Sequence, residues 1–429
     1  MNSLRALLLI VRRSLREHAL STTVTVVSAA LASGLVMAVF AVAAQSRAAF
    51  AGGPVGFDAV LGARGSATQL VLNTVFHLET SPGNIPWSLY KEVREDRTVE
   101  LAIPYAVGDN YRGLRIVGTT PEIFTKFEYV KGQKFEFVGY GEPFDADLRQ
   151  AVVGSEAARI SGLKRGDVFQ PSHGVPVSGN AQNPDGNGVQ HDERYVVTGV
   201  LKPTNSPSDR VIWIPIEGIF RMGGHVLRGT GENFEAQAGA VIPDEHKEVS
   251  AVMLKFKSPI HGRRMEDLIN RQGKVATLAW PIANVVAQLF ERLGWVNRIL
   301  ELVAYLVVVV AGGGLLSSIY NTMNERRREF AILRALGARR RTVFSAIVLE
   351  AMTISVLGSL LGYLVYGTIM AVAAAIIRER TGVVLDTFEW HPALVQTPLA
   401  MLAVGAIAGI FPARKAYATD VASTLSRNL

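Results

Sequence analysis

The sequence predicts an α-helical membrane protein with four transmembrane helices and a large α+β extracytoplasmic domain between the first and second helices. Two observations lead to this fold class. Four long stretches contain no Asp, Glu, Lys or Arg, and a segment of mixed composition separates the first stretch from the other three. The 429 residues are 49% hydrophobic and the mean hydropathy is +0.23, so membrane helices are expected before a soluble fold.

Each uncharged stretch is long enough to cross a membrane. A spanning helix needs about 20 apolar residues to cross a hydrocarbon core of roughly 30 Å. Four stretches meet this requirement: 20–44, 302–320, 351–377 and 393–413. The first follows a basic segment and ends in small residues, as a signal peptide does. Its apolar run is longer than a signal peptide's, which favours an uncleaved anchor.

The distribution of basic residues predicts the orientation. The segment after the second stretch holds seven arginines against Glu325 and Glu329, and Arg414, Lys415 and Arg427 follow the fourth. Basic loops face the cytoplasm, so both termini are expected inside a multi-pass protein of the bacterial inner membrane. The segments 45–298 and 378–392 are then external. Much of the net charge of +7 reflects topology, and no nucleic-acid partner is expected.

The predicted domains follow from this topology. They are a cytoplasmic N-terminus with the first helix (1–44), an extracytoplasmic domain (45–298), and three helices with a cytoplasmic loop at 321–342 (299–429). Within the external domain, "ERYVVTGVL" and "DRVIWIPI" alternate as strands do, and "SLYKEVRED" suggests a helix. Ser172 to Asp192 and Met222 to Ala240 are rich in Gly and Asn. They are predicted to be surface loops, or else contacts for a substrate or periplasmic partner.

Three segments carry a resemblance to a known family. They are "NERRREFAILRALGARRRTVFSAIVLEAM" from Asn324 to Met352, "AVVGSEAARISGLKRGDVF" with the two strand segments above, and the tail "FPARKAYATDVASTL". The first resembles the cytoplasmic loop of the MacB/FtsX/LolC-type ABC transporter permease family, the second its periplasmic core domain, and the third its Pro-Ala-Arg-x-Ala ending. The stretch from Gly56 to Leu78 has no equivalent in the family.

The resemblance implies the permease subunit of a bacterial ATP-binding cassette transporter. Such a subunit forms a homodimer or heterodimer and couples ATP hydrolysis by a separate chain to conformational change in its periplasmic domain. It would export or extract a periplasmic or outer-leaflet substrate: a lipoprotein, drug, peptide or haem-like molecule. A periplasmic adaptor or substrate-binding protein would be a further partner. The alternatives are an FtsX-like mechanotransmitter that regulates a cell-wall hydrolase, and a component of a metal-handling transporter.

The chain is not expected to be an enzyme. It contains no Gly-x-x-x-x-Gly-Lys-Ser/Thr sequence, so ATP and Mg should be bound by the partner ATPase, and no cofactor is expected here. Nor does it show a nucleophile–base motif, although sequence order alone does not exclude a triad. No cysteine is present, which excludes disulfides and thiolate metal sites.

The loop from Asn324 to Gly337 is predicted to couple the chain to the ATPase. It should form a short amphipathic helix in which Phe330, Leu333 and Leu336 make an apolar ridge that enters a groove on the partner. Gly337 should end the helix in a left-handed turn. The alternative is a helix lying on anionic lipid. The predicted coupling residues are Glu325, Arg326, Arg327, Arg328, Glu329, Phe330, Leu333, Arg334, Leu336 and Gly337.

Polar and small residues inside the third and fourth stretches also carry predictions. Glu350 should face protein rather than lipid, because an unpaired carboxylate is costly in a membrane; its contact either changes during the cycle or is a fixed hydrogen bond. The patterns Gly358-x-x-x-Gly362 and Gly405-x-x-x-Gly409 let helices approach closely, and packing within one subunit is favoured over dimerisation.

Histidines are concentrated in the external segments. Six lie in the large domain and His391 lies in the other external loop. Imidazole binds zinc and copper well, but no pair shows a metal-ligand spacing such as i and i+4 on a helix. They are therefore predicted to be surface or structural residues, without a metal site. The six are His77, His173, His191, His225, His246 and His261.

Overall fold

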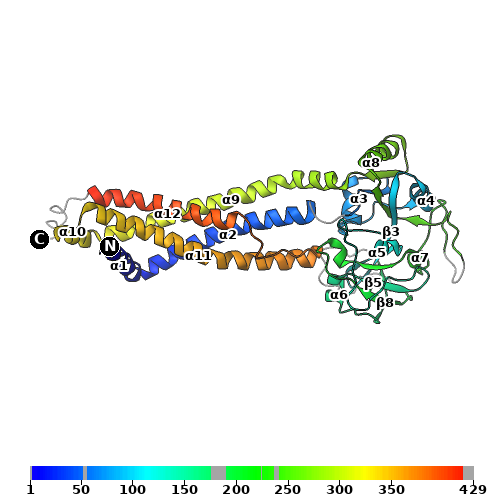
Figure 1. Ribbon diagram of the computed structural model, residues 1–429, viewed down its shortest axis with the longest axis horizontal. Coiled ribbons are helices and arrows are strands. Elements are labelled where there is room, and N and C mark those ends of the chain that lie inside the picture. Colours follow the sequence, from blue (N-terminus) through cyan, green and yellow to red (C-terminus); the bar gives the residue numbers. More distant parts are fainter. Residues whose placement is uncertain (1, 52–55, 175–189, 224, 236–240, 419–429) are drawn as a thin grey trace. The chain divides into compact units, whose positions relative to one another are not determined.

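The computed structural model describes residues 2–51, 56–174, 190–223, 225–235 and 241–418 (Figure 1). The chain divides into two compact units. The first comprises Met1–Ser46, Leu293–Ile376 and Leu385–Leu429, and the second comprises Arg47–Arg292 and Ile377–Val384. Parts of the two Gly-rich segments, 175–189, 224 and 236–240, and the tail from residue 419, with Arg427, lie outside the described residues.

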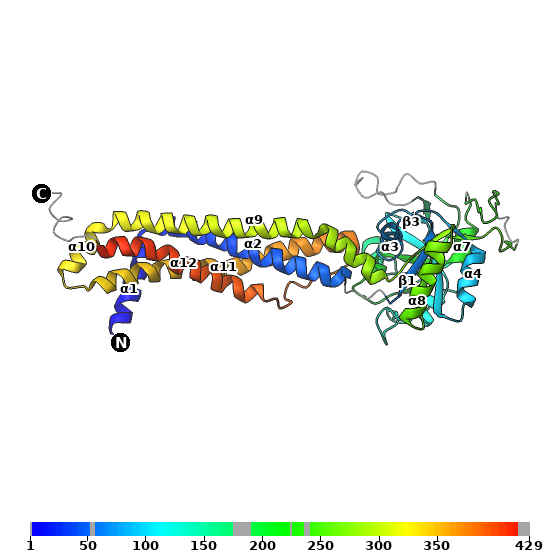
Figure 2. The same cartoon turned by 90° about the horizontal axis from the view of Figure 1, so that it is seen from above.

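The first unit is helical. Long helices run side by side, and the short helices α1 and α10 lie at the same end of the bundle in both ribbon views (Figures 1 and 2). The helices that contribute to this unit are α1 (Asn2–Glu17), α2 (Ala19–Ala51), α9 (Ile282–Glu325), α10 (Arg327–Ala335), α11 (Arg340–Thr381) and α12 (Ala393–Ala418).

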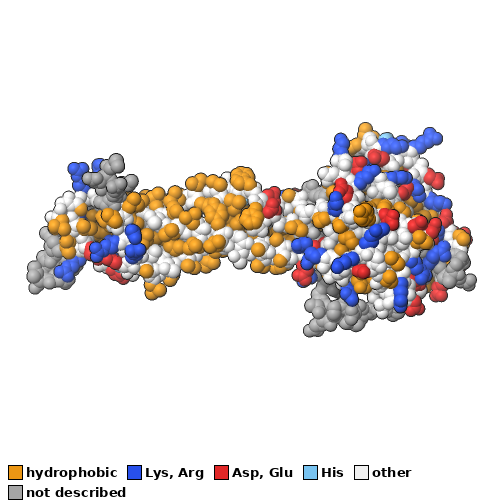
Figure 3. Space-filling model, turned by 60° about the horizontal axis from the view of Figure 1, so that its bottom comes forward, with side chains coloured by type: hydrophobic (Ala, Val, Ile, Leu, Met, Phe, Trp, Pro, Cys, Tyr) orange, Lys and Arg blue, Asp and Glu red, His pale blue; other side chains and the backbone are white. Residues whose placement is uncertain are grey.

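Four of these helices are long and apolar enough to cross a membrane, as the sequence predicts. Their spanning segments are Ala19–Ala49, Gly294–Glu325, Arg340–Thr381 and Ala393–Lys415. Hydrophobic side chains cover most of the surface over these helices in Figure 3. Exposed apolar residues such as Val309 and Val310 would be costly in water, so the chain is a membrane protein with one such helix before the large domain and three after it.

The paired glycines pack helices together within the chain, as predicted. A Cβ atom at Gly358 would lie 2.5 Å from Cβ of Ala29, and one at Gly362 would lie 1.9 Å from Oγ of Ser33, so α11 touches α2 at these positions. Similarly, a Cβ atom at Gly405 would meet Ser355 of α11 at 2.1 Å. The missing side chains therefore allow the close helix approach that stabilises membrane bundles without a hydrophobic driving force.

The second unit is built on a mixed sheet. Its strand order is β12-β1-β11-β3-β4-β9-β5-β8-β6, with β7 paired to β3; β4·β9 and β5·β8 are parallel and the other pairs are antiparallel. A small second sheet pairs β10 with β2. The strands are β1 (Ala59–Ala63), β2 (Ile85–Pro86), β3 (Val99–Tyr111), β4 (Leu114–Thr119), β5 (Gln150–Val153), β6 (Val168–Phe169), β7 (Ser172–His173), β8 (Tyr195–Val200), β9 (Ile212–Pro215), β10 (Glu248–Val249), β11 (Ala251–Phe256) and β12 (Ala276–Ala279).

Helices cover both faces of this sheet (Figure 2). The predicted strand segments form β8 and β9, and the predicted helix forms α4. The helical elements are α3 (Ala67–Thr74), α4 (Trp87–Glu95), α5 (Glu122–Thr125), α6 (Ser155–Ser161), the 3₁₀ turn η1 (Pro207–Arg210), α7 (Ile216–Phe220), α8 (Pro259–Glu266) and the π-helical turn η2 (Asp267–Gln272). The expected mixed domain of strands and helices is confirmed.

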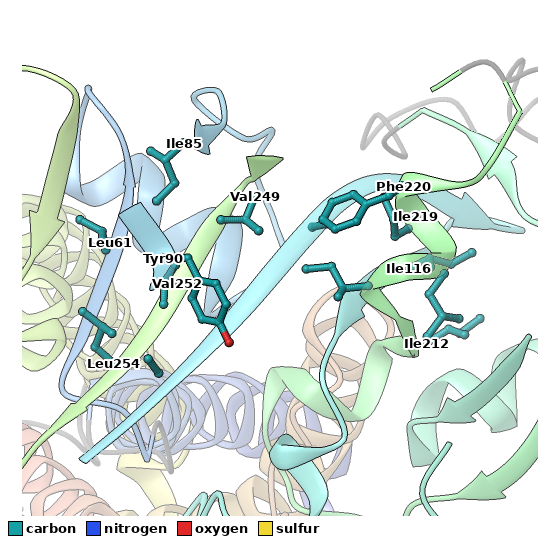
Figure 4. Close-up of a cluster of buried hydrophobic side chains, with 14 of the residues drawn as sticks. Leu61, Ile85, Tyr90, Ile116, Ile212, Ile219, Phe220, Val249, Val252 and Leu254 are labelled. Atoms are coloured by element: carbon teal, nitrogen blue, oxygen red, sulfur yellow. The ribbon is translucent and has the colours of Figure 1, made fainter. Parts of the chain in front are cut away.

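Strand alternation divides the interior into two cores. Leu61 and Val252 point to the face covered by α4, α7 and α8, where Tyr90 and Phe220 join them (Figure 4). Trp213 and its aromatic neighbours fill the opposite face, which α3, α5 and the first turns of α9 cover. Because burying each large apolar side chain contributes roughly 1.5–3 kcal/mol, both faces stabilise the sheet.

A short segment distant in sequence completes the second unit. Residues 378–384, expected in a separate external loop, and Ile377, expected at the end of the third apolar stretch, group with Arg47–Arg292. Both Nε and Nη2 of Arg378 lie 2.9 Å from the carboxylate of Glu156, and the amide of Val384 donates to Asn205 Oδ1 at 2.6 Å. Burial alone would raise the pKa of Glu156, but hydrogen bonds from Arg159 and Arg378 outweigh it and lower the pKa. We refer to residues 377–384 as the strap.

Candidate coupling site

The predicted coupling loop folds as a short helix between two long ones. Helix α9 ends at Glu325, Arg326 interrupts the helical run, and α10 follows from Arg327 to Ala335. Gly337 ends α10 with a φ of 97°, as the sequence predicts. Its amide donates to the carbonyl of Arg334 at 3.1 Å and that of Ala338 to Leu333 at 3.0 Å, the paired bonds of a Schellman end.

The apolar residues of α10 do not form the continuous exposed ridge that the sequence predicts. Phe330 is only 7% exposed and belongs to the same buried cluster of the first unit as Met323, Val343 and Ile347, against which the half-buried Leu333 packs. Leu336 is 80% exposed and Ile332 is 45% exposed. The expectation that Phe330 faces a partner is therefore corrected: the exposed apolar edge of α10 consists of Ile332 and Leu336.

The charged residues of the loop also divide between interior and surface. Arg328 and Glu329 are exposed, and Arg327 and Arg334 are half-buried. The exposed carboxylate of Glu325 lies 3.4 Å from Nε2 of His18. Arg326 is buried. Its guanidinium lies over the Phe330 ring, with Cζ 5.0 Å from the ring centroid, and its Nε donates to Glu329 at 3.1 Å.

Arg326 joins the loop to two other helices through a polar link of three residues. Its Nη1 donates to Ser14 Oγ of α1 at 2.5 Å, and Ser14 Oγ donates to Oε1 of Glu350 in α11 at 2.6 Å. Arg326 Nη1 also lies 3.5 Å from Glu350 Oε2. All three residues are at most 8% exposed. Glu350 thus faces protein, as predicted, and we call this set the Ser14–Arg326–Glu350 link.

Burial makes this link resistant to separation. Removing one partner of a buried ion pair leaves an uncompensated charge and typically costs about 3–5 kcal/mol. Arg326 and Glu350 are 3.5 Å apart, which is too long for a good direct hydrogen bond. Ser14 bridges them by hydrogen-bonding to both side chains. Movement of the start of α10 is therefore expected to displace α1 and α11 rather than break the link.

Ser14 was not predicted from the sequence. It lies three residues after Val11, and these two are the most buried of residues 7–17 in α1. A small polar residue on the apolar face of a basic amphipathic helix is the signal that could have suggested a buried polar partner.

The spacing of the histidines along the sequence did not predict that three of them come together in the fold. Three of them, His173, His191 and His225, gather around Asp109 in the second unit. Burial alone would raise the pKa of Asp109, but hydrogen bonds from His191 and His225 outweigh it and lower the pKa to about 2. The hydrogen bond to Asp109 raises the pKa of His191.

The described chain combines four apolar helices, a large domain after the first of them and a short basic helix between the second and third. Residues 301–421 match the family model of the FtsX-like permease C-terminal domain. The chain is similar to MacB/FtsX-type ABC permeases, which confirms the resemblance seen in its sequence.

Two curated relatives illustrate the similarity. A probable export ATP-binding/permease protein MacB of Pseudomonas entomophila is 24% identical over 201 residues, which are 46% of this chain and 29% of that protein. A pyoverdine export ATP-binding/permease protein PvdT of Pseudomonas syringae pv. tomato is 31% identical over 124 residues, 29% of this chain and 18% of that protein. The chain thus matches less than a third of the length of either relative.

Among solved structures, the periplasmic region of MacB from Actinobacillus actinomycetemcomitans aligns with 56% of this chain and 94% of its own. The sequence identity is 11% and the TM-score is 0.32.

Proposed function

We propose that this chain is the membrane subunit of an ATP-driven export machine whose ATPase is a separate polypeptide. The observation that carries the proposal is α10: it presents Ile332 and Leu336 outward and is tied to α1 and α11 by the Ser14–Arg326–Glu350 link. An exposed apolar edge flanked by arginines suits a groove on a protein partner. The two export relatives, both named as ATP-binding/permease proteins, support the same assignment.

In this proposal, the ATPase moves α10 during its nucleotide cycle. The Ser14–Arg326–Glu350 link passes that movement to α1 and α11, because separating it would leave a buried charge without a partner. Helix α9 supplies Ile282 to the core of the second unit and Met323 to the core of the first, within one uninterrupted helix. In the proposal, movement of α9 and α11 is therefore transmitted along these continuous helices to the external domain. The external domain then changes conformation and acts on a periplasmic or outer-leaflet substrate.

The proposal includes an orientation in the inner membrane. Both termini and α10 are placed in the cytoplasm, because Arg328, Arg339, Arg340 and Arg341 are exposed around this helix and basic loops stay inside. The large second unit is then external, and a second permease copy completes the machine.

A co-purification experiment tests the docking role. The tagged chain is co-expressed with stand-alone ABC ATPases of the same genome and purified in detergent. Ile332→Asp with Leu336→Asp should abolish recovery of the ATPase, because two carboxylates would lose water in a closed groove without a partner. Val138→Asp, at an exposed apolar residue of the second unit, is the matched control and should retain the ATPase. Retention of the ATPase by the double variant would contradict docking through α10.

A further inference from the structure

Four side chains from separate segments of the second unit converge on one point. Asp109 is near the end of β3, His173 is in β7, His191 precedes β8, and His225 follows α7. His173 and His191 belong to the first of the two Gly-rich segments, and His225 belongs to the second. Pairing of β7 with β3 places His173 opposite Asp109 in the sheet register.

The distances between their donor atoms are those of a metal coordination shell. Asp109 Oδ1 lies 3.1 Å from His191 Nε2, 3.2 Å from His225 Nε2 and 3.4 Å from His173 Nδ1. His173 Nδ1 lies 3.2 Å from His225 Nε2. In a tetrahedron with ligands at about 2.0–2.1 Å from zinc, neighbouring ligand atoms are about 3.3 Å apart. Four of the six separations are therefore close to those of a tetrahedral site, and all four ligand atoms lie within 4.8 Å of one another.

The hydrogen bonds around His191 suit a metal ligand. Its Nδ1 lies 3.0 Å from the carbonyl oxygen of Gly223, which only accepts, so Nδ1 carries a proton. Nε2 faces the Asp109 carboxylate, which is also an acceptor, so the ring either donates a second proton there, as in the hydrogen bond described above, or offers a neutral lone pair to a cation. A cation between them satisfies both. An Nδ1–H bond to a backbone carbonyl is the usual support that orients a metal-binding histidine.

Asp109 provides an independent observation. Its side chain is fully buried, and its second oxygen, Oδ2, has no hydrogen-bond partner among the residues that the structure describes. A buried carboxylate oxygen without a donor is costly, because it has lost its water and gained nothing in return. A metal ion at the convergence of the three imidazoles would neutralise this carboxylate.

We propose that Asp109, His173, His191 and His225 bind one divalent transition-metal ion, with Zn²⁺ as the best match. Three imidazole nitrogens and one carboxylate oxygen suit zinc, whereas Ca²⁺ and Mg²⁺ take oxygen ligands. His173 is 55% exposed, which gives the ion an entry side, while Asp109, His191 and His225 form the buried floor. The ion joins β3, β7 and the segment after α7. This site does not depend on the proposed coupling role of α10.

Metal titration of the full-length chain tests the proposal. The protein is purified in detergent with a tag that contains no histidine, stripped with a chelator, and titrated with Zn²⁺ against a chromophoric competitor. We expect one Zn²⁺ per chain. His225→Ala and Asp109→Asn should each weaken binding by about 100-fold or more, since even loss of a residue that only supports a ligand costs 10–100-fold.

Two further arms separate ligand loss from misfolding. His173→Ala removes the exposed ligand, so the sheet should remain folded while zinc affinity falls. His261→Ala removes a histidine of the same unit outside the cluster and should bind zinc as the native chain does. Co²⁺ added to the native chain should give the strong visible absorption bands of four-coordinate cobalt, and these should be lost in His173→Ala.

Equal zinc affinity in the native chain, His173→Ala and His225→Ala would overturn the proposal, as would binding no tighter than that of free histidine. Weak six-coordinate Co²⁺ bands in the native chain would also overturn the proposed geometry. In the first two cases the four residues would be a hydrogen-bonded cluster, and in the third they would bind the metal with a geometry other than tetrahedral.

Discussion

At the scale of single residues, the Ser14–Arg326–Glu350 link carries most of the proposed coupling. Sequence reasoning identified Glu350 as a residue that must face protein, because a lone carboxylate in a membrane helix is costly. It did not identify Ser14, and it listed Arg326 among the residues predicted to couple the chain to the ATPase. Positions 14, 326 and 350 are brought together only by tertiary packing, for which local periodicity contains no information.

A double-mutant cycle tests the link. Arg326→Met and Glu350→Leu should each lower the stability of the detergent-solubilised chain by about 3–5 kcal/mol, because each leaves one buried charge alone. The double variant should be more stable than the sum of the two effects predicts, because neither charge remains. Thermal unfolding of the three variants provides the measurement. Purely additive losses would show that the two side chains do not interact.

His77 gives a prediction for pH dependence. Burial lowers its pKa from 6.5 to about 3, with a smaller contribution from the charge of Arg115, so the folded chain keeps His77 neutral while the unfolded chain protonates it. Stability from this residue is present above pH 6.5 and is lost as the pH falls toward 3, by about 2 kcal/mol between pH 7 and 5.

His77→Asn removes the titrating group and is compatible with the residue's positive φ of 55°. Its unfolding midpoint should fall less between pH 7 and 5 than that of the native chain. Parallel pH profiles for the two proteins would mean that His77 titrates normally in the folded state.

At the scale of elements, the long helices were predictable and their contacts were predictable in part. Uninterrupted apolar runs determine where a membrane helix lies, and Gly337 determines where α10 ends. The exposed face of α10 was not predictable, because apolar residues occur on both of its faces and only the bundle decides which face is covered. Likewise, no local signal showed that the strap joins the second unit.

The glycine contacts between α11 and α2 can be tested with a matched pair on one helix. Gly362→Ala should destabilise the chain, because its Cβ would lie 1.9 Å from Ser33 Oγ and 3.2 Å from the carbonyl of Ala30. Gly367→Ala adds the same methyl group where nothing lies within 4 Å, so it should be neutral or slightly stabilising. Thermal unfolding in detergent compares the two. An equal response would indicate that α2 and α11 do not pack at Gly362.

The strap gives a second prediction at this scale. Residues 47–292 expressed alone should be less stable than the same fragment carrying residues 377–384 on a flexible linker, because Glu156 is buried and loses Arg378 without the strap. Arg378→Met in the linked strap should remove most of the added stability. If the fragment alone, the fragment with the strap and the Arg378→Met form all unfold cooperatively at the same temperature, the strap does not contribute to the stability of the second unit.

At the scale of the whole molecule, topology can be tested directly because the native chain contains no cysteine. Single cysteines are introduced at Val130, on the second unit, and at Arg339, next to α10. An impermeant thiol reagent applied to the periplasmic side should label the first and spare the second until the membrane is opened. Labelling of both positions from the periplasmic side would contradict the four-span topology with both termini inside.

Site-specific photo-crosslinking tests whether α10 contacts the ATPase through its exposed edge. A photoreactive phenylalanine analogue replaces Leu336, which is 80% exposed, or Phe330, which is 7% exposed, in the full machine in membranes. We expect a crosslinked permease–ATPase product from position 336 and none from position 330. Crosslinking from position 336 to lipid alone, with no ATPase product, would contradict it and assign α10 to the membrane surface.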